Sequence, residues 1–271
     1  MRRSLALLLF SLGIGGYCLL PFLWFVLTSL KSPAELTAIP PTFVPSFHWD
    51  FYYSALVNHG LLRYIGNSLI VAGSATLVSI AVGSLAAYAM ARFQLAWTKF
   101  YLLALLAISM FPQIAIAGPV WSILNHLGWL NTHYGLVTAY IALSLPLAIW
   151  ILTTFFREVP VEIEEAALVD GCSRLQALYK VVLPLAAPGI LTAALLIFIN
   201  TWNEFFFALI ILTDPDVQTL PVGIALFPGE YTMPWGEIAA ASTMATLPLI
   251  ALTLVFQRGI VRGLAAGAVK G

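Results

Sequence analysis

The feature that most constrains the fold of this chain is the length of its uncharged apolar segments. From Phe100 to Phe156 the sequence contains no Asp, Glu, Lys or Arg. About 20 apolar residues in a helix cross the roughly 30 Å hydrocarbon core of a bilayer, so this segment is too long for one crossing and right for two. A backbone in hydrocarbon must satisfy its own hydrogen bonds, which favours helices. The sequence therefore predicts an all-α protein that crosses a membrane several times.

Composition supports this class and excludes others. Hydrophobic residues make up 61% of the chain and charged residues 9%, which excludes a soluble globule. Twelve basic residues balance twelve acidic ones, so net charge favours neither nucleic acid nor acidic ligands as partners. Neither the two cysteines, Cys18 and Cys172, nor the four histidines have the spacing of a metal site. The histidines are His48, His59, His126 and His133.

Six spans account for the apolar segments. The first follows Arg2 and Arg3 and is too long for a cleaved signal peptide. The spans are expected within Ser4 to Leu30, Tyr64 to Ala91, two parts of Phe100 to Phe156 divided at Asn125 to Gly135, Ala187 to Leu212, and Ile238 to Phe256. Pro112 and Pro119 are expected to bend or break the third span. Lys31 to Arg63 is expected to be an external loop with one short interfacial helix. The whole chain, 1–271, is expected to form a single transmembrane domain, with the first span at about 5–30, the core spans at about 65–256 and a tail at 257–271.

The positions of the basic residues predict the orientation. In this arrangement ten basic residues face inward and two face outward, which is the asymmetry expected from the positive-inside rule. The inner residues are Arg2, Arg3, Arg92, Lys99, Arg157, Arg174, Lys180, Arg258, Arg262 and Lys270, and the outer ones are Lys31 and Arg63. Both termini are therefore predicted to be cytoplasmic.

A charged segment between the fourth and fifth spans, residues 157–186, is predicted to form two helices joined by a tight bend. Pro160 suits the first position of a helix, because its missing N–H would be unpaired there. Gly171 can adopt the left-handed conformation that ends a helix, and Ser173 with Gln176 forms a capping-box pattern that starts the next. The second helix is expected to carry Leu175, Leu178 and Val182 on one side and to end near Pro184. We call residues 157–186 the elbow.

The amino-acid sequence of the elbow resembles the EAA loop of ABC importer permeases. Glu165, Ala166 and Ala167 are followed at the family's spacing by Gly171 and then by Val181, Leu183 and Pro184, and only Val181 departs, since isoleucine is usual there. The resemblance implies that the elbow is a cytoplasmic coupling helix that docks on a separate ATPase subunit. The residues implied in this contact are Glu165, Ala166, Ala167, Asp170, Gly171, Leu183 and Pro184.

Polar residues inside the fifth span are candidates for a translocation path. A carboxylate at membrane depth is costly unless it faces protein or water, so Glu204 is expected to have a function. On a continuous helix Asn200, Asn203 and Glu204 share one face, and Trp202 beside Asn203 offers an aromatic ring and an amide for a sugar. The alternatives are that Glu204 reaches the interface or pairs with a partner subunit, and that Trp202 belongs to an interfacial belt.

Three further segments narrow the resemblance to the smaller, six-span permease of maltose-type sugar importers. They are Thr201 to Phe205, the run MFPQIAIAGPVWSILNHLGWLNTHYGLV, and the ending GLAAGAVKG. The resemblance implies a bacterial or archaeal plasma membrane, a heterodimer with a second homologous permease, two ATPase subunits and an extracytoplasmic sugar-binding protein. It also implies that the tail residues Gly267, Val269, Lys270 and Gly271 contact the ATPase. ATP and Mg would be used by that partner, with no cofactor on this chain.

A membrane scaffold or anchor would need neither a polar face in the fifth span nor broken helices. Two further alternatives to a sugar importer remain open. One is an ABC permease for another small polar solute, such as glycerol phosphate. The other is an ion-coupled secondary transporter, although only Glu204 could carry a coupling ion and no repeat is evident. The chain contains no phosphate-cradling or hydrolase motif, so enzymatic activity of its own is not expected.

Overall fold

The computed structural model describes residues 2–93, 97–227 and 233–268, with side chains for 7–93, 97–227 and 233–256. Every regular element in these ranges is helical. In chain order they are α1 (Arg2–Ser29), α2 (Pro33–Leu36), α3 (Asp50–Val57), α4 (Leu61–Arg92), α5 (Thr98–Ser109), α6 (Gln113–His126), α7 (His133–Glu158), α8 (Val161–Val169), α9 (Arg174–Ala177), the π-helix η1 (Leu178–Val182), α10 (Leu183–Leu185), α11 (Ala187–Trp202), α12 (Phe206–Ile211), α13 (Leu220–Ala225) and α14 (Trp235–Ala268).

Four helical segments are long and apolar enough to cross a membrane. They are Leu7–Ser29, Leu61–Arg92, His133–Glu158 and Trp235–Phe256. Two helix pairs qualify when each is taken together: α5 with α6, bent by 89°, and Arg174–Leu185 with α11, bent by 81°. The prediction of an all-helical protein with several spans is confirmed, with four to six candidate spans in the described residues. The orientation of the termini stays a prediction.

The third span is broken at one of the two prolines that were expected to bend or break it. The chain breaks between α5 and α6, where Pro112 caps α6, and this confirms the expectation for Pro112. Pro119 lies inside α6, which continues past it, so the chain is not broken there and a bend at Pro119 stays a prediction. Backbone N–H groups at the start of a helix have no intrahelical acceptor, so Pro112, which lacks an N–H, suits the start of α6. Lys99, expected in a loop, lies in the first turn of α5.

The last helix is longer than the expected sixth span. α14 continues to Ala268, so residues from 257 onward extend a helix and do not form a separate tail before that point. Gly267 therefore lies in α14. Val269, Lys270 and Gly271 lie outside the described residues.

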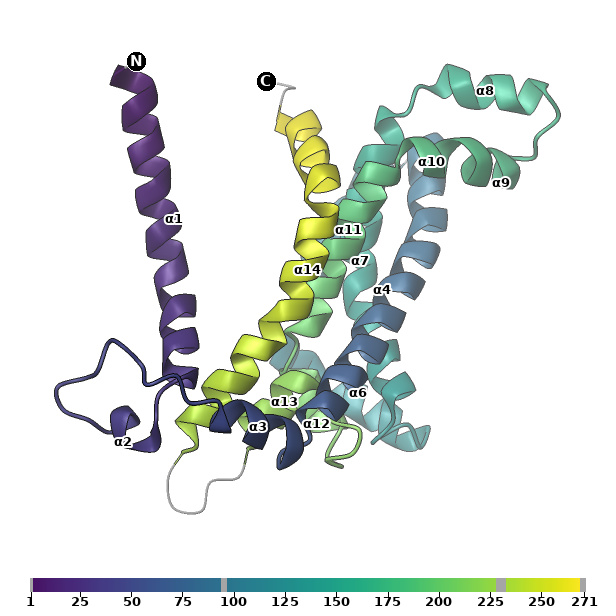
Figure 1. Ribbon diagram of the computed structural model, residues 1–271. Coiled ribbons are helices and arrows are strands. Elements are labelled where there is room, and N and C mark those ends of the chain that lie inside the picture. The colour runs from purple at the N-terminus through teal and green to yellow at the C-terminus, as the bar shows by residue number, and fades with distance from the viewer. Residues whose placement is uncertain (1, 94–96, 228–232, 269–271) are drawn as a thin grey trace. The chain divides into compact units, whose positions relative to one another are not determined.

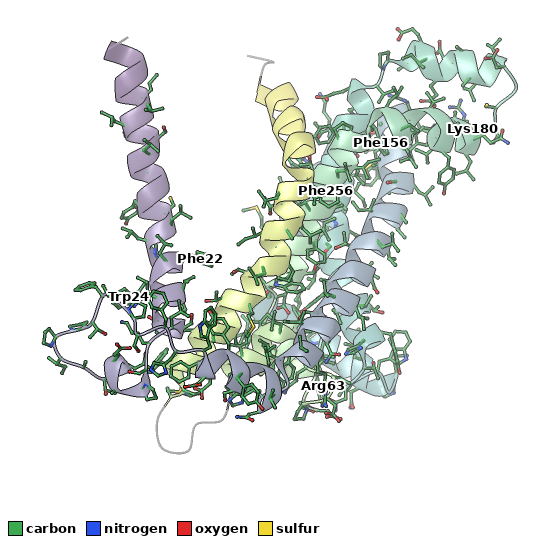
Figure 2. The ribbon with its side chains drawn as sticks, viewed as in Figure 1. Phe22, Trp24, Arg63, Phe156, Lys180 and Phe256 are labelled. Atoms are coloured by element: carbon green, nitrogen blue, oxygen red, sulfur yellow. The ribbon has the colours of Figure 1, made fainter. Side chains whose placement is uncertain are left out.

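The chain divides into two compact units, and the first contains Met1–Ile65 and Val222–Leu249. Phe22 and Trp24 lie near the C-terminal end of α1 (Figure 2). The segment expected as a loop with one short helix contains two, α2 and α3. Glu35 completes a capping box with Ser32 and also accepts a hydrogen bond of 2.8 Å from the Ser46 hydroxyl. The Ser32 backbone N–H, followed by the Ser46 hydroxyl, lowers the pKa of Glu35 to about 2.

The second unit contains Gly66–Pro221 and Ile250–Gly271. Within it α7 packs against α5 and α11. The close approach of α7 and α11 depends on Gly189, because a Cβ there would lie 2.1 Å from Cγ of Phe155. The elbow helices α8 and α9 lie at the same end of this unit as the last turns of α4 and α7, and run across them (Figure 1). The elbow is therefore positioned by the ends of the spans.

Candidate functional site

The elbow folds as its capping residues predict. α7 ends at Glu158, Pro160 caps α8, and α8 ends before Gly171, whose φ of +90° is in the left-handed region that favours glycine. Ser173 and Gln176 form the predicted capping box at the start of α9. Pro160 was expected at the first helical position, but it is the N-cap residue, and Val161 is the first helical residue.

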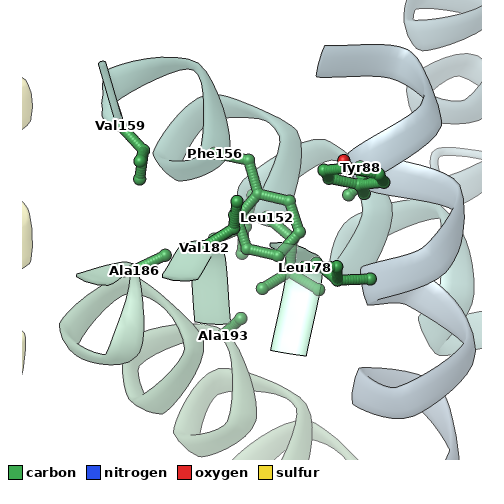
Figure 3. Close-up of a cluster of buried hydrophobic side chains, with 10 residues drawn as sticks. Tyr88, Leu152, Phe156, Val159, Leu178, Val182, Ala186 and Ala193 are labelled. Carbon is green, nitrogen blue, oxygen red and sulfur yellow. The ribbon is translucent and has the colours of Figure 1, made fainter. Parts of the chain in front are cut away.

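A buried apolar cluster seats the second half of the elbow on the spans. Phe156 is fully buried, and Leu178 and Val182 of η1 lie beside it together with Leu152 (Figure 3). Leu175, expected on the same face, is 55% exposed, so that part of the prediction was wrong. The π-helical turn at Leu178–Val182 changes the register between Leu175 and the two residues that follow, which takes Leu175 off the buried face. Lys180 lies farther out along the elbow than Phe156 (Figure 2).

A buried ion pair anchors the first half of the elbow. Glu164 of α8 is 2% exposed, and its Oε2 lies 2.6 Å from Nε of Arg92 at the end of α4. The Tyr88 hydroxyl donates a hydrogen bond to Oε1 of the same carboxylate. Arg92 also donates from Nη2 to the carbonyl of Val159, at 2.9 Å. This network ties the start of α8 to α4 and to the end of α7.

The sequence analysis did not predict the pair between Glu164 and Arg92. A basic residue at the end of a span, Arg92, was available as a signal. Nothing in the local pattern indicated which glutamate would meet it.

Five of the seven residues expected to contact an ATPase are exposed. Glu165 is adjacent to Glu164 in sequence, and successive helical residues point about 100° apart, so one carboxylate is buried and the other exposed. Ala166, Asp170, Gly171 and Pro184 are also exposed, while Ala167 and Leu183 are half-buried. We call the exposed surface from Glu165 to Gly171 the elbow face. It offers one carboxylate, small side chains and a second carboxylate to a partner.

The polar residues of the fifth span do not share a helix face as predicted. α11 ends at Trp202, Asn203 caps that end, and Glu204 lies in the break before α12. Glu204 accepts hydrogen bonds from the backbone N–H groups of Phe207, at 2.9 Å, and Ala208, at 3.2 Å. The carboxylate therefore caps a new helix, and the continuous helix assumed for this segment was wrong.

Tyr140 of α7 supplies the remaining partner of Glu204. Its hydroxyl donates to Oε2 at 2.6 Å, and Tyr140 itself is 1% exposed. The break between α11 and α12 is thereby fixed to α7. Glu204 therefore has hydrogen-bond partners within its own chain, and its place on a translocation path stays a prediction.

The other candidates near the break differ in exposure. Trp202 is 2% exposed and stacks on Phe198, with ring centroids 5.6 Å apart. It is a packing residue, so neither a sugar platform nor a place in an interfacial belt fits it. Asn203 is exposed and donates from its side chain to the carbonyl of Ile199, at 2.8 Å. Asn200 is exposed and lines a cavity with residues of α6 and α7.

No group of histidine, cysteine and acidic side chains in the described residues could hold a metal ion. His59 stacks on Phe227, and His133 bonds through Nε2 to the carbonyl of Val217 at 3.1 Å. The two cysteines are free thiols.

The family of this chain can now be stated from comparison with known proteins. A family model described as binding-protein-dependent transport system inner membrane component matches residues 79–265, which include both anchors of the elbow. The chain belongs to this family. The match confirms the predicted inner-membrane location and the predicted role as the membrane component of a transporter instead of its ATPase. Membership implies a binding protein and an ATPase as partners of the permease.

Relatives match the permease over almost its full length. The trehalose/maltose transport system permease protein MalG of Thermococcus litoralis is 39% identical and covers 99% of this chain and 98% of its own length. The sulfoquinovosyl glycerol permease SmoH of Agrobacterium fabrum is 41% identical, covering 93% of this chain and 89% of its own. The trehalose permease SugB of Mycobacterium tuberculosis is 41% identical, covering 94% of each.

A solved structure shows the same fold. It is a bacterial ABC transporter involved in the import of the acidic polysaccharide alginate, and the likeness has a TM-score of 0.79 at 22% identity. It covers 95% of this chain and 96% of the compared chain. The resemblance to ABC importer permeases is thus confirmed at the level of family and fold.

Proposed function

We propose that the permease forms half of the translocation pathway of an ABC sugar importer and is driven by a cytoplasmic ATPase that docks on the elbow face. The observation that carries this proposal is the elbow itself. One side of it is fixed to the spans by Glu164, Arg92 and Phe156, while Glu165 and Gly171 on the other side remain exposed. This arrangement can transmit a movement of the ATPase to the spans, because a docked partner can move the spans only through a rigid connection. Full-length similarity to trehalose and maltose permeases supports a sugar as the solute.

The assembly that we infer around the permease follows from its sidedness. With the basic residues inside, both termini and the elbow are cytoplasmic, where ATP is available. A second homologous permease completes the pathway, two ATPase subunits bind below, and an extracytoplasmic binding protein delivers the solute. ATP and Mg act in the ATPase subunits. The end of the chain, Gly267 to Gly271, is proposed to contact the ATPase as well.

The mechanism proposed is alternating access. Closure of the ATPase dimer draws the two docked elbows together. The movement passes through the ion pair of Glu164 with Arg92 into α4, and through the cluster around Phe156 into α7 and α11. These helices then rotate to open the pathway outward, toward the loaded binding protein.

The proposal is tested by ATP-dependent sugar uptake in vesicles containing the permease with its partner permease, ATPase and binding protein. Glu165→Lys reverses a charge on the elbow face, and Gly171→Asp strains the bend and adds charge to it. Each variant is expected to abolish uptake while the permease remains in the membrane at its normal level. Glu165→Gln, which removes the charge without reversing it, serves as the matched control and is expected to retain partial uptake. Uptake at the normal rate in both Glu165→Lys and Gly171→Asp would refute docking at this face.

A further inference from the structure

A cavity of about 470 Å³ lies in the second unit, where the break between α5 and α6 faces α7 and α11. Ser109 and Gln113 line the cavity from the two sides of the break, Ser144 from α7, and Asn200 from α11. All of these belong to candidate spans, so the cavity lies within the membrane part of the chain.

Two residues of α7 that line this cavity each carry a polar group without its usual hydrogen-bond partner. Ser144 is 2% exposed, and among the described residues its hydroxyl has no hydrogen-bond partner. Pro146 has no N–H, so the carbonyl of Ala142, four residues earlier, loses its usual helical donor. Ala142 and Pro146 line the same cavity. A buried polar group without a partner is costly, and the two together indicate a ligand that brings hydroxyl groups.

The residues of this chain that line the cavity offer no charge to a ligand. None of the residues that line the cavity is acidic, basic or a histidine; the polar ones carry hydroxyl or amide groups. A charged solute would have no opposite charge to meet there, and an unpaired charge in a membrane interior is expensive. Phe111, which is 56% exposed and lines the cavity, offers an aromatic face of the kind that packs on the apolar side of a sugar ring.

We propose that this cavity is a solute subsite of the permease and that it takes a neutral, polyhydroxylated molecule, not an acidic sugar. This rests on the proposed function as an importer. The Ser144 hydroxyl, the freed carbonyl of Ala142 and the side-chain amides of Gln113 and Asn200 hydrogen-bond the hydroxyl groups of the solute. The Ser144 hydroxyl gains a partner only when the solute is present, so the solute is expected to occupy this subsite transiently during transport.

The decisive variant is Ser144→Ala, measured as the concentration dependence of trehalose and maltose uptake by the full reconstituted transporter. If the hydroxyl contacts the solute, KM rises about three- to tenfold, the loss of one hydrogen bond, with the maximal rate little changed. A hydroxyl with only a structural role gives the opposite result, since removing an unsatisfied buried group is neutral or stabilising and leaves KM unchanged. Asn200→Leu and Gln113→Leu are expected to raise KM in the same way. Thr154→Val is the matched control, because Thr154 lies on α7 outside the cavity and its hydroxyl bonds to the carbonyl of Trp150.

The charge of the solute is tested without the binding protein, which has its own selectivity. Saturation-transfer NMR on the permease–ATPase complex is expected to detect trehalose or maltose, to lose the signal in Ser144→Ala, and to detect no glucuronic acid. Equal binding of the acidic sugar, or unchanged KM in all three variants, would overturn the subsite while leaving the importer proposal in place. A wild-type transporter that takes up neither neutral nor acidic sugars with ATP would instead refute the proposed function.

Discussion

The ion pair between Arg92 and Glu164 gives the sharpest test of how the elbow is held. Arg92→Met removes the cation and keeps a similar apolar stem. The two side chains are 5% and 3% exposed, so solvent screens their interaction very little. The variant leaves the carboxylate with the Tyr88 hydroxyl alone and also removes the hydrogen bond to Val159. Removing one partner of a buried pair costs about 3–5 kcal/mol, chiefly because the remaining charge is buried without compensation.

This cost is expected as local opening of the elbow, since the rest of the second unit does not depend on the pair. Hydrogen exchange of the α8 amides reports that opening. Because each 1.4 kcal/mol changes an equilibrium tenfold, exchange of residues 161–169 should accelerate by about 100-fold or more in Arg92→Met. ATP-dependent uptake should fall with it, while the ATPase subunits still bind nucleotide.

Two controls separate this explanation from a general loss of stability. Arg157→Met removes an exposed basic residue at the same end of the spans, whose bond to the carbonyl of Met90 is 3.5 Å long, and should change exchange very little. The double variant Arg92→Met with Glu164→Met removes both charges and should recover part of the loss, giving a positive coupling energy in a double-mutant cycle. Unchanged α8 exchange in Arg92→Met would refute the anchoring argument, and a double variant no better than the sum of the singles would refute the pairing.

Three further predictions concern other parts of the chain. Gly171→Ala should lower the free energy of local opening of the elbow by about 1–2 kcal/mol, because alanine, which has a Cβ, must adopt the left-handed conformation there. Faster hydrogen exchange at residues 165–176 would show this, and exchange at the wild-type rate would contradict it. Glu204→Leu should lower the free energy of unfolding by about 1 kcal/mol for the lost cap of α12 and by about 1–3 kcal/mol for the unpaired Tyr140 hydroxyl. Glu204→Gln should lower it much less. Thermal unfolding of the purified transporter compares the two variants, and equal melting temperatures would contradict the capping role. The pKa of Glu35 is lowered from 4.5 to about 2, so the stability that this carboxylate contributes is complete above pH 4.5 and is lost as pH falls toward 2. NMR of the carboxyl carbon should place the titration midpoint of Glu35 near 2. A midpoint near 4.5 would contradict its hydrogen bonds to Ser32 and Ser46.

The sequence predicted the parts of the elbow that local chemistry decides. Gly171 ends one helix and Ser173 starts the next because each acts on backbone groups within four residues of itself. The choice between Glu164 and Glu165 could not be made in this way. It depends on where the end of α4 places Arg92, 72 residues earlier in the chain, and no local pattern carries that information.

The two breaks in the spans also differ in whether the local sequence predicts them. Pro112 marks the first break, since proline restricts the residue before it and suits a helix start. The break at residues 203–205 contains no proline or glycine, so the apolar run around it predicted one continuous helix.

Glu204 explains how that second break is tolerated and why its sequence was misleading. Interrupting a helix in a membrane frees backbone N–H groups that neither lipid nor water can satisfy. A carboxylate with two acceptor oxygens can bind two of them and still accept a hydroxyl, which is what Glu204 does with Phe207, Ala208 and Tyr140. A lone acidic residue within an apolar run is therefore as much a sign of a broken helix as of a path for solute. In this permease Glu204 stabilises the break, and the solute subsite that we propose is formed by the uncharged polar groups around Ser144.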